Sequence, residues 1–164
     1  DNDPVYVMEN TTLYGNTGEV PDPADGDFLI PLGKADIKRE GSDISLIAHG
    51  ASVLRCLEAA DILANEHNID AEVGALRSIR PLDQDAIIES VKKTNRAVLV
   101  DESKPFCGVS AQITTLIQEY AFDYLDAPVK RVCTIDAPAI YSPHVEQDQR
   151  PNAKRIVAQV LTIA

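Results

Sequence analysis

The chain has few of the features that point directly to a class of protein. Its three cysteines are odd in number, lie far apart and form no C-x-x-C pair, so we expect neither a disulfide framework nor a zinc site. A reducing compartment suits this composition better than an oxidising one. No apolar run approaches the roughly 18 residues of a membrane span, and the first residues are acidic, so we expect no membrane segment and no signal peptide.

Basic residues are outnumbered by acidic ones. The chain contains 15 Lys and Arg against 26 Asp and Glu, which gives a formal net charge of −11. Because nucleic-acid binding needs clustered Lys and Arg to neutralise phosphates, we expect no nucleic-acid partner. An acidic surface favours encounters with basic partners, although excess charge also promotes solubility.

Glycine-rich phosphate-binding loops are missing as well. The sequence contains neither a G-x-G-x-x-G motif nor a P-loop, so neither standard nucleotide-binding loop is present. What the chain does contain is a regular alternation of two kinds of segment. Apolar runs rich in β-branched residues predict strands at 34–40, 44–48, 71–76, 96–102 and 128–135. Apolar residues at helical spacing predict helices at 52–67, 83–95, 109–120 and 152–164.

This alternation predicts an α/β domain with a largely parallel sheet. The three-residue connection after Glu40 is too short for a crossover, so the first strand should run antiparallel to the others. Ser52 and Asp83 are the expected N-caps of the first two helices. A chain of 164 residues is long enough to build such a domain around a substantial core.

The first thirty-one residues do not follow this pattern. "PVYVME" (4–9) predicts a short strand. Residues 10–31 then hold three prolines, three glycines and several acids with little periodicity, which is typical of a linker. Because compact domains seldom contain such a long irregular connection, we expect residues 1–31 to be the tail of another domain.

Polar residues gather where the predicted strands end. In an open parallel sheet, ligands bind beyond the carboxyl ends of the strands. Here these ends carry His49, the stretch "LRSIRPLD" (76–83), the pair Asp101-Glu102, and Asp136. The hypothesis of a small-ligand site at this edge therefore stays open.

Arg77 and Arg80 in "LRSIRPLD" have two possible roles. They could bind an anion, but the loop has no glycine to let the backbone approach a phosphate. Arginine at a strand end more often pairs with a carboxylate. We therefore expect structural ion pairs or subunit contacts, with Asp101 and Glu102 as the candidate partners.

No residue has a strong catalytic signature. His49 could act as a general base at neutral pH, but the sequence fixes no partner for it, so a hydrogen-bonded histidine at a strand end is the preferred interpretation. Cys107 lies near a helix start yet has no identifiable base. Asp101 and Glu102 are adjacent on a strand and should point in opposite directions. We expect no catalytic residue in this chain.

Six stretches follow one another in a specific order and spacing: "ENTTLYG" (9–15), "DFLIPLGKADIKREGSD" (27–43), "LRSIRPLD" (76–83), "IIESVKKTNRAVLVDE" (87–102), "CGVSAQI" (107–113) and "FDYLDAPVKRV" (122–132). As a set they resemble the beta subunit of pyruvate dehydrogenase, the thiamine-diphosphate-dependent component of the 2-oxoacid dehydrogenase complexes. The chain resembles the carboxyl-terminal half of that subunit.

The resemblance implies a division of the chain and a fold. Residues 1–31 would be the tail of the pyrimidine-binding domain and the interdomain linker, and residues 32–164 a transketolase C-terminal domain. The implied fold is a three-layer α/β/α sandwich. Its five-stranded mixed sheet would have the order 1-3-2-4-5, with the first strand antiparallel and the 71–76 strand between the first two.

The resemblance also implies an activity that this chain does not hold alone. The parent enzyme would decarboxylate pyruvate and reductively acetylate lipoyl groups, using thiamine diphosphate and magnesium. The family binds the diphosphate through a G-D-G motif on the alpha subunit and activates the cofactor with a glutamate of the pyrimidine-binding domain. We therefore expect no cofactor or metal site here, and an inactive fragment.

The implied role of this domain is assembly. The partners would be the alpha subunit, a second beta subunit and the subunit-binding domain of dihydrolipoyl acetyltransferase. By position, Asp126 of the "LDAP" motif and the terminal carboxylate of Ala164 would meet Lys and Arg of that last domain. The compartment would be the cytoplasm in a bacterium, or the mitochondrial matrix or plastid in a eukaryote.

Two other hypotheses remain open at this point. The chain could belong to a related 2-oxoacid or acetoin dehydrogenase, since the substrate pocket is not in this part of the subunit. It could also be a stand-alone α/β interaction module with the same fold. From the sequence alone, without the resemblance, Asp126 is only a loop acid before a turn proline.

Overall fold

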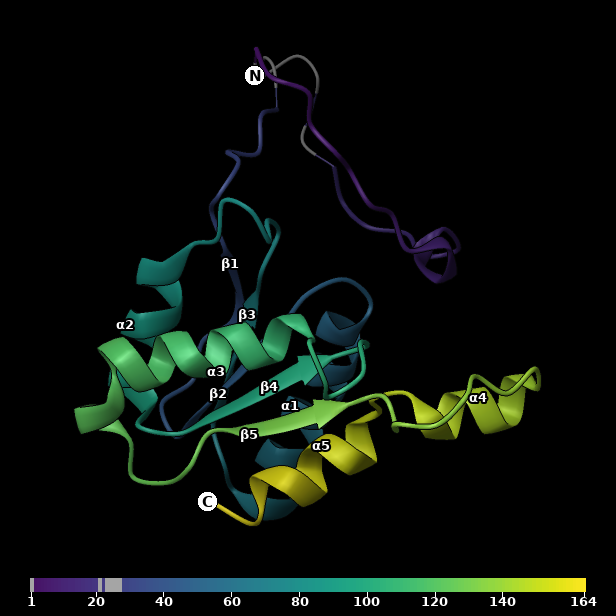
Figure 1. Cartoon of the computed structure of the whole chain (residues 1–164). Helices are drawn as coiled ribbons and strands as arrows, with labels where there is room; N and C mark the ends of the chain where they lie inside the picture. The colour runs from purple at the N-terminus through teal and green to yellow at the C-terminus, as the bar shows by residue number, and fades with distance from the viewer. Residues whose placement is uncertain (1, 21, 23–27) are drawn as a thin grey trace.

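A single mixed sheet organises the chain. The structure is a computed structural model that describes residues 2–20, 22 and 28–164 (Figure 1). The sheet has the order β1-β3-β2-β4-β5, and β1 is antiparallel to β3 while all other neighbours are parallel. Its strands are β1 (Asp36–Arg39), β2 (Ile44–Ala48), β3 (Ala71–Ala75), β4 (Ala97–Asp101) and β5 (Lys130–Cys133). The predicted strand order and the antiparallel first strand are confirmed.

Helices cover both faces of this sheet. The larger ones are α1 (Ser52–His67), α2 (Gln84–Thr94), α3 (Val109–Tyr120) and α5 (Ala153–Val160). One core lies between the sheet and the pair α1 and α5, and a second core lies between the sheet and the pair α2 and α3 (Figure 1). The predicted three-layer α/β/α sandwich is therefore confirmed. No helix in the described part of the chain is long and apolar enough to cross a membrane.

The central strands are buried on both faces, as their continuous apolar runs indicated. Leu46 of β2 packs in the first core and its neighbour Ile47 in the second, because successive side chains of a strand point to opposite faces. Val98 and Leu99 of β4 divide between the two cores in the same way. This double burial is the usual consequence of helices that cover both sides of a parallel sheet.

The helix ends follow the sequence signals in one case and depart from them in another. Asp83 caps α2, since its side chain accepts from the backbone N–H of Ala86, as predicted. The prediction of Ser52 as the cap of α1 is wrong, because Ala51 takes that position. Ser52 instead lies inside the first turn, where its buried hydroxyl has no hydrogen-bond partner. Gly50 adopts a positive φ of +57° in the turn before α1. The helix therefore begins one residue earlier than expected.

Shorter elements complete the chain. They are the 3-10 helices η1 (Thr11–Leu13) and η3 (Phe122–Tyr124) and the helix α4 (Pro143–Gln149). The patterns did not predict α4, which projects from the end of β5 on a long connection (Figure 1). The three cysteines are free.

Residues 4–9 of the amino-terminal segment lie away from the sheet (Figure 1). The predicted strand at 4–9 is wrong, because these residues have no assigned secondary structure. A strand needs a neighbour for its backbone hydrogen bonds, and no described strand lies beside this segment. Tyr6 and Met8 are almost fully exposed. Most of the predicted linker is irregular, and residues 21 and 23–27 of it lie outside the described residues.

Candidate functional site

The loop "LRSIRPLD" is fastened to the chain that enters β1. Ser78 Oγ accepts from the backbone N–H of Gly33 at 2.9 Å, and Asp83 Oδ2 accepts from that of Ala35 at 2.9 Å. Asp83 therefore caps α2 and also anchors the residues before β1. The loop joins the entry of the domain to one end of the sheet, which is a structural role.

The two arginines of this loop behave differently. Arg77 Nη2 lies 3.5 Å from Asp36 Oδ1 and also donates to the carbonyl of Ala35. Its partner is thus the carboxylate of β1, and neither Asp101 nor Glu102. Arg80 is exposed, and no ion pair joins it to any residue that the structure describes. A role for Arg80 in subunit contacts stays a prediction.

The carboxyl ends of β2 and β4 bring His49 and Asp101 together. Asp101 is almost fully buried at the end of β4. Its carboxylate accepts from the backbone N–H groups of Ser103 and Ser110, each at 2.9 Å. His49 Nε2 lies 3.4 Å from Asp101 Oδ1, but the two atoms do not meet hydrogen-bond geometry. The contact is therefore an electrostatic one and not a hydrogen bond.

These neighbours keep Asp101 ionised. Burial by itself raises the pKa of a carboxyl group. Here the contact with His49 and the hydrogen bonds from Ser103 and Ser110 outweigh burial and hold the pKa of Asp101 far below its usual range. An acid that stays charged at every physiological pH cannot donate a proton, and its oxygens are occupied by N–H groups. Asp101 therefore orders the start of α3.

Glu102 faces the other way and contacts the amino-terminal segment. Its carboxylate accepts from Asn10 Nδ2 at 3.2 Å and lies 3.8 Å from Arg150 Nη1. A hollow of about 580 Å³ opens here, lined by η1, the start of α1, Glu102, and the end of α4. A ligand at the switch point would lie in this hollow, but the acids and bases that line it already pair with one another.

Metal binding and thiol chemistry find no support in the described residues. No group of three or more His, Cys, Asp or Glu side chains in that part of the chain is arranged to hold a metal ion. Cys107 is exposed, with φ +56° in the loop before α3, and no base contacts it among the residues placed by the structure.

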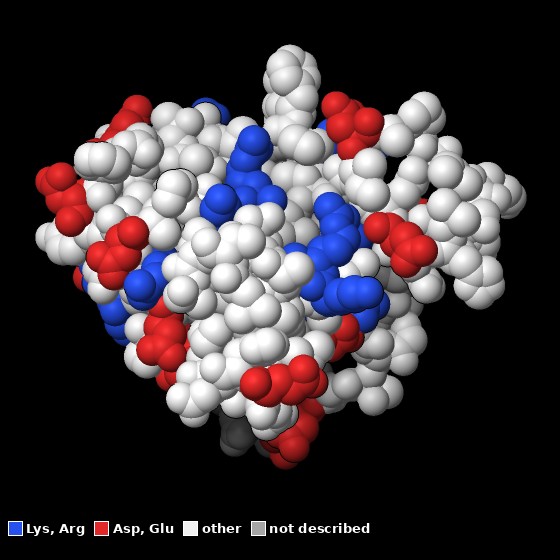
Figure 2. All heavy atoms as spheres, turned by 90° about the horizontal axis from the view of Figure 1, so that it is seen from below, with Lys and Arg blue, Asp and Glu red and all other residues white. Residues whose placement is uncertain are grey.

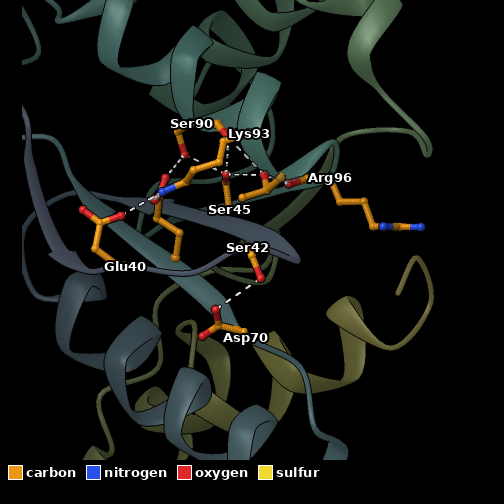
Figure 3. A network of polar contacts seen from close by, with 9 residues as sticks. Glu40, Ser42, Ser45, Asp70, Ser90, Lys93 and Arg96 are labelled. Carbon is orange, nitrogen blue, oxygen red and sulfur yellow. Dashed lines mark hydrogen bonds and ion pairs between the residues drawn. The ribbon is translucent and has the colours of Figure 1, made fainter.

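A second polar cluster lies at the opposite end of the sheet and was missed by sequence reasoning. Glu72 of β3 is 1% exposed, and Lys93 of α2 contacts its Oε2. Ser90 Oγ donates to Glu72 Oε1 at 2.5 Å and lies 2.7 Å from Ser45 Oγ of β2. Lys93 also reaches Glu40 Oε2 at 2.8 Å (Figure 3). The detectable signal was a glutamate inside the apolar run "AEVGAL".

The cluster is electrostatically tight. Hydrogen bonds to Glu40 and Glu72 raise the pKa of Lys93, and the same lysine lowers the pKa of Glu40. Lys93 therefore remains charged across the physiological range. The cluster joins the β1–β2 turn, β3 and α2, so it fixes α2 on the sheet.

Asp126 lies at this same end, in the loop between η3 and β5. Its backbone N–H donates to the carbonyl of Asn95 at 2.9 Å, and Asn95 Nδ2 donates to the carbonyl of Tyr124 at 2.8 Å. The Asp126 side chain is 59% exposed, with Oδ2 3.7 Å from Arg96 Nη2. The loop is thus anchored to the end of α2, while the carboxylate remains accessible to solvent.

The carboxyl terminus lies on the same side of the fold. Ile163 belongs to the core that α1 and α5 form, and Ala127 packs against that core. Ala164 is exposed, and its N–H donates to Val160. The terminal residue and the Asp126 loop therefore occupy one end of the sheet (Figure 1).

Comparison with known proteins places this fold and these motifs in a family. The family model described as "Transketolase, C-terminal domain" matches residues 33–156. The chain belongs to the transketolase C-terminal domain family. A split-gene transketolase, solved as an inactive beta4 tetramer, superposes on this family member with a TM-score of 0.72 and 25% identity. That superposition covers 89% of the chain and 45% of the solved chain.

Relatives of this transketolase C-terminal domain include beta subunits of two kinds of oxidoreductase. A pyruvate dehydrogenase E1 component subunit beta from Rickettsia felis is 43% identical over 98% of the chain and 48% of its own length, and the mouse mitochondrial counterpart is 46% identical over 98% and 45%. An acetoin:2,6-dichlorophenolindophenol oxidoreductase subunit beta from Bacillus subtilis is 45% identical over 99% and 46%. The chain thus spans about half the length of these relatives. The resemblance to pyruvate dehydrogenase beta subunits is confirmed.

Proposed function

We propose that the chain is the carboxyl-terminal assembly domain of a pyruvate dehydrogenase beta subunit. The observation that carries this proposal is the 43% to 46% identity, over 98% of the chain, to beta subunits of that enzyme. The parent enzyme would oxidatively decarboxylate pyruvate and reductively acetylate lipoyl groups. Thiamine diphosphate and magnesium would be bound outside this chain.

The division of the chain follows from this proposal. Residues 32–164 form the transketolase C-terminal domain, and residues 1–31 are the last part of the pyrimidine-binding domain and the linker. Residues 4–9 support this division. They have the composition of a strand, but their apolar side chains are exposed and no described strand pairs with them, as we expect for a strand whose sheet belongs to another domain. The parent would act in the cytoplasm of a bacterium, or in a eukaryote in the mitochondrial matrix, since the mouse relative is named as mitochondrial, or in a plastid.

Within the enzyme, this domain would hold the alpha and beta subunits together and dock the acetyltransferase. Asp126 is suited to meet a basic subunit-binding domain, because its carboxylate is more than half exposed while hydrogen bonds fix the backbone around it. Ala164, the second residue proposed to meet this partner, is exposed at the same end of the fold. Docking would replace the long contact of Asp126 with Arg96 by an intermolecular ion pair.

The docking role can be tested with a single substitution. In the full-length beta subunit purified with its alpha subunit, Asp126→Ala should weaken binding of the isolated subunit-binding domain by about 2 kcal/mol or more. Isothermal titration calorimetry measures this. Asp123→Ala is the control, because Asp123 is an exposed acid of the neighbouring η3. Equal affinity of the Asp126 variant and wild type at low salt would contradict the assignment.

Acetoin is the second candidate substrate, because the Bacillus subtilis relative is as similar as the pyruvate enzymes. The substrate pocket lies outside this chain, so the docking test does not decide between them. Initial rates of the assembled enzyme, measured with pyruvate and with acetoin, distinguish the two substrates. Pyruvate-dependent reduction of lipoyl groups supports the main proposal, and turnover of acetoin alone would replace it.

A further inference from the structure

Most basic residues of this acidic protein pair with carboxylates. All but one of those without an ion pair to a described carboxylate gather at one edge of the sheet. Of the 15 Lys and Arg, nine form ion pairs with described carboxylates, which leaves six. One of the six is Arg80. The other five lie on or beside β5: Lys104, Lys130, Arg131, Lys154 and Arg155.

The two edges carry the same dipeptide in different surroundings. On β1, Lys38 lies 2.6 Å from Asp36 and Arg39 lies 2.6 Å from Asp61. On β5, neither Lys130 nor Arg131 has an ion pair with any carboxylate in the described part of the chain. The positive charge is therefore neutralised at one edge of the sheet and left uncompensated at the other.

The cations beside β5 are held in place by neutral groups. Arg131 Nη1 donates to the carbonyl of Pro105 at 2.9 Å. Arg155 donates to the carbonyls of Gln149 and Arg150, each at 3.0 Å, and to that of Cys133 at 2.7 Å. These hydrogen bonds hold the guanidinium groups in position, but neutral carbonyl oxygens do not neutralise their positive charge. Further N–H donors of both arginines are unused by any of these bonds.

Lys104 extends the same cluster. Its Nζ donates to the carbonyl of Ile135 at 2.6 Å and also contacts that of Ala137. It thus lies where the chain leaves β5, beyond Lys130 and Arg131. Carbonyl oxygens orient its ammonium group, and no described acid shares it.

A shallow hollow runs along this edge. It has a volume of about 380 Å³, and Lys130, Arg131 and Arg155 line it together with Thr134 and Gln159, with no Asp or Glu among its lining residues. On this face, Lys and Arg side chains lie near the middle and most Asp and Glu side chains lie around them (Figure 2). In a protein of net charge −11, this arrangement is an electropositive patch inside an acidic surface.

We propose that the β5 edge is a docking surface for an acidic, extended segment of a partner protein. Its anchors are Lys104, Lys130, Arg131 and Arg155. Complementary charge steers such a partner and fixes its register, and guanidinium groups match carboxylates through paired hydrogen bonds. An edge strand also offers backbone groups to which an extended segment can add.

Two other interpretations explain less of the arrangement. Lysines on an edge strand protect it from pairing with other sheets, but protection needs neither the arginine of α5 nor the fixed guanidinium groups. A phosphate-sized anion would need a compact cradle of backbone N–H groups. Here the cations spread along a strand, a helix and a loop, which suits a segment with several carboxylates.

The test uses the full-length protein that contains this chain and a fluorescein-labelled octaglutamate peptide. Fluorescence anisotropy at low salt should detect binding to wild type. The double variant Lys130→Gln/Arg131→Gln should weaken that binding about tenfold, because two exposed charge pairs are lost. The matched control, Lys38→Gln/Arg39→Gln, removes the same charge from β1 and should change binding less than twofold.

The outcomes separate the interpretations. Equal losses in both double variants would show a general effect of net charge and overturn the proposal, as would the absence of binding to wild type at low salt. Displacement of the peptide by inorganic phosphate at matched charge concentration would assign the hollow to a small anion instead. If the double variant folds poorly, Lys130→Gln alone serves, since no hydrogen bond to a described residue is lost, and about threefold weaker binding is expected.

Discussion

The two ends of the sheet stabilise a buried carboxylate in different ways. At the amino end, Glu72 depends on one lysine and one serine hydroxyl. At the carboxyl end, Asp101 depends on two backbone N–H groups, with His49 Nε2 at 3.4 Å from its Oδ1. When a single cation stabilises a buried carboxylate, one substitution removes that stabilisation. When backbone N–H groups stabilise it, most side-chain substitutions leave the stabilisation in place. The amino end should therefore be the more sensitive of the two.

Removal of the cation at the amino end should have the largest effect. We expect Lys93→Met to lower the free energy of unfolding by about 3 kcal/mol, because Glu72 is then left buried and uncompensated. Chemical denaturation measures the loss. Lys92→Met is the control, since Lys92 makes an exposed pair with Glu89 and should cost less than about 1 kcal/mol.

A double variant sharpens this result. If the uncompensated charge is the cause, Glu72→Gln in the Lys93→Met background should recover part of the loss. A double variant that is less stable than Lys93→Met would show that packing of the lysine stem, and not the charge, is responsible.

The carboxyl end should respond less. We expect Asp101→Asn to lower the free energy of unfolding by about 2 kcal/mol, since the amide keeps one acceptor oxygen where the carboxylate had two. Glu102→Gln, which changes a half-exposed neighbour, should cost less than about 1 kcal/mol. A loss larger than that of Lys93→Met would reverse the comparison between the two ends.

The effect of pH on Asp101 has a definite sign. Its pKa is lowered in the folded protein, so its contribution is fully present above the unfolded value of about 4 and is lost as pH falls through the folded value. The stability difference between wild type and Asp101→Asn should therefore shrink as pH falls below about 4. Unfolding curves measured above and below that pH check it.

The smallest expected effect is a gain. Ser52 follows β2 at the carboxyl end, and its hydroxyl is buried without a hydrogen bond. Because an unsatisfied buried hydroxyl costs free energy, we expect Ser52→Ala to raise the free energy of unfolding by about 0.5 to 1 kcal/mol. A loss of stability on thermal or chemical denaturation would mean that the hydroxyl has a partner in solution.

The sequence predicted much of this fold because the relevant signals are local. Apolar runs located the five strands of the sheet, and Asp83 marked the start of α2. The strand at 4–9 was wrong, since its β-branched residues indicate a strand only where a neighbour exists to pair with it. The position of Ser52 also could not be read from its type, because the turn at Gly50 decides where α1 begins.

The polar clusters were less predictable, because each joins residues that are distant in sequence. Lys93 reaches Glu72 across 21 residues, and Ser45 reaches Ser90 across 45. The pairing of Arg77 with Asp36 has the same cause, since β1 lies beside β3 and not beside β2. Glu72 inside an apolar strand was the one local sign that a buried partner must exist. Strand order, and not residue type, determines which partner that is.

The exposed run Val5, Tyr6, Val7 and Met8 has a consequence for handling the protein. An extended apolar segment with free backbone groups can recruit identical segments from other molecules and template their association. A preparation of these 164 residues alone should therefore tend to self-associate through this stretch, even though the net charge of −11 opposes aggregation. The tendency of this preparation to aggregate would then depend on these exposed residues outside the α/β/α sandwich, and not on the packed domain.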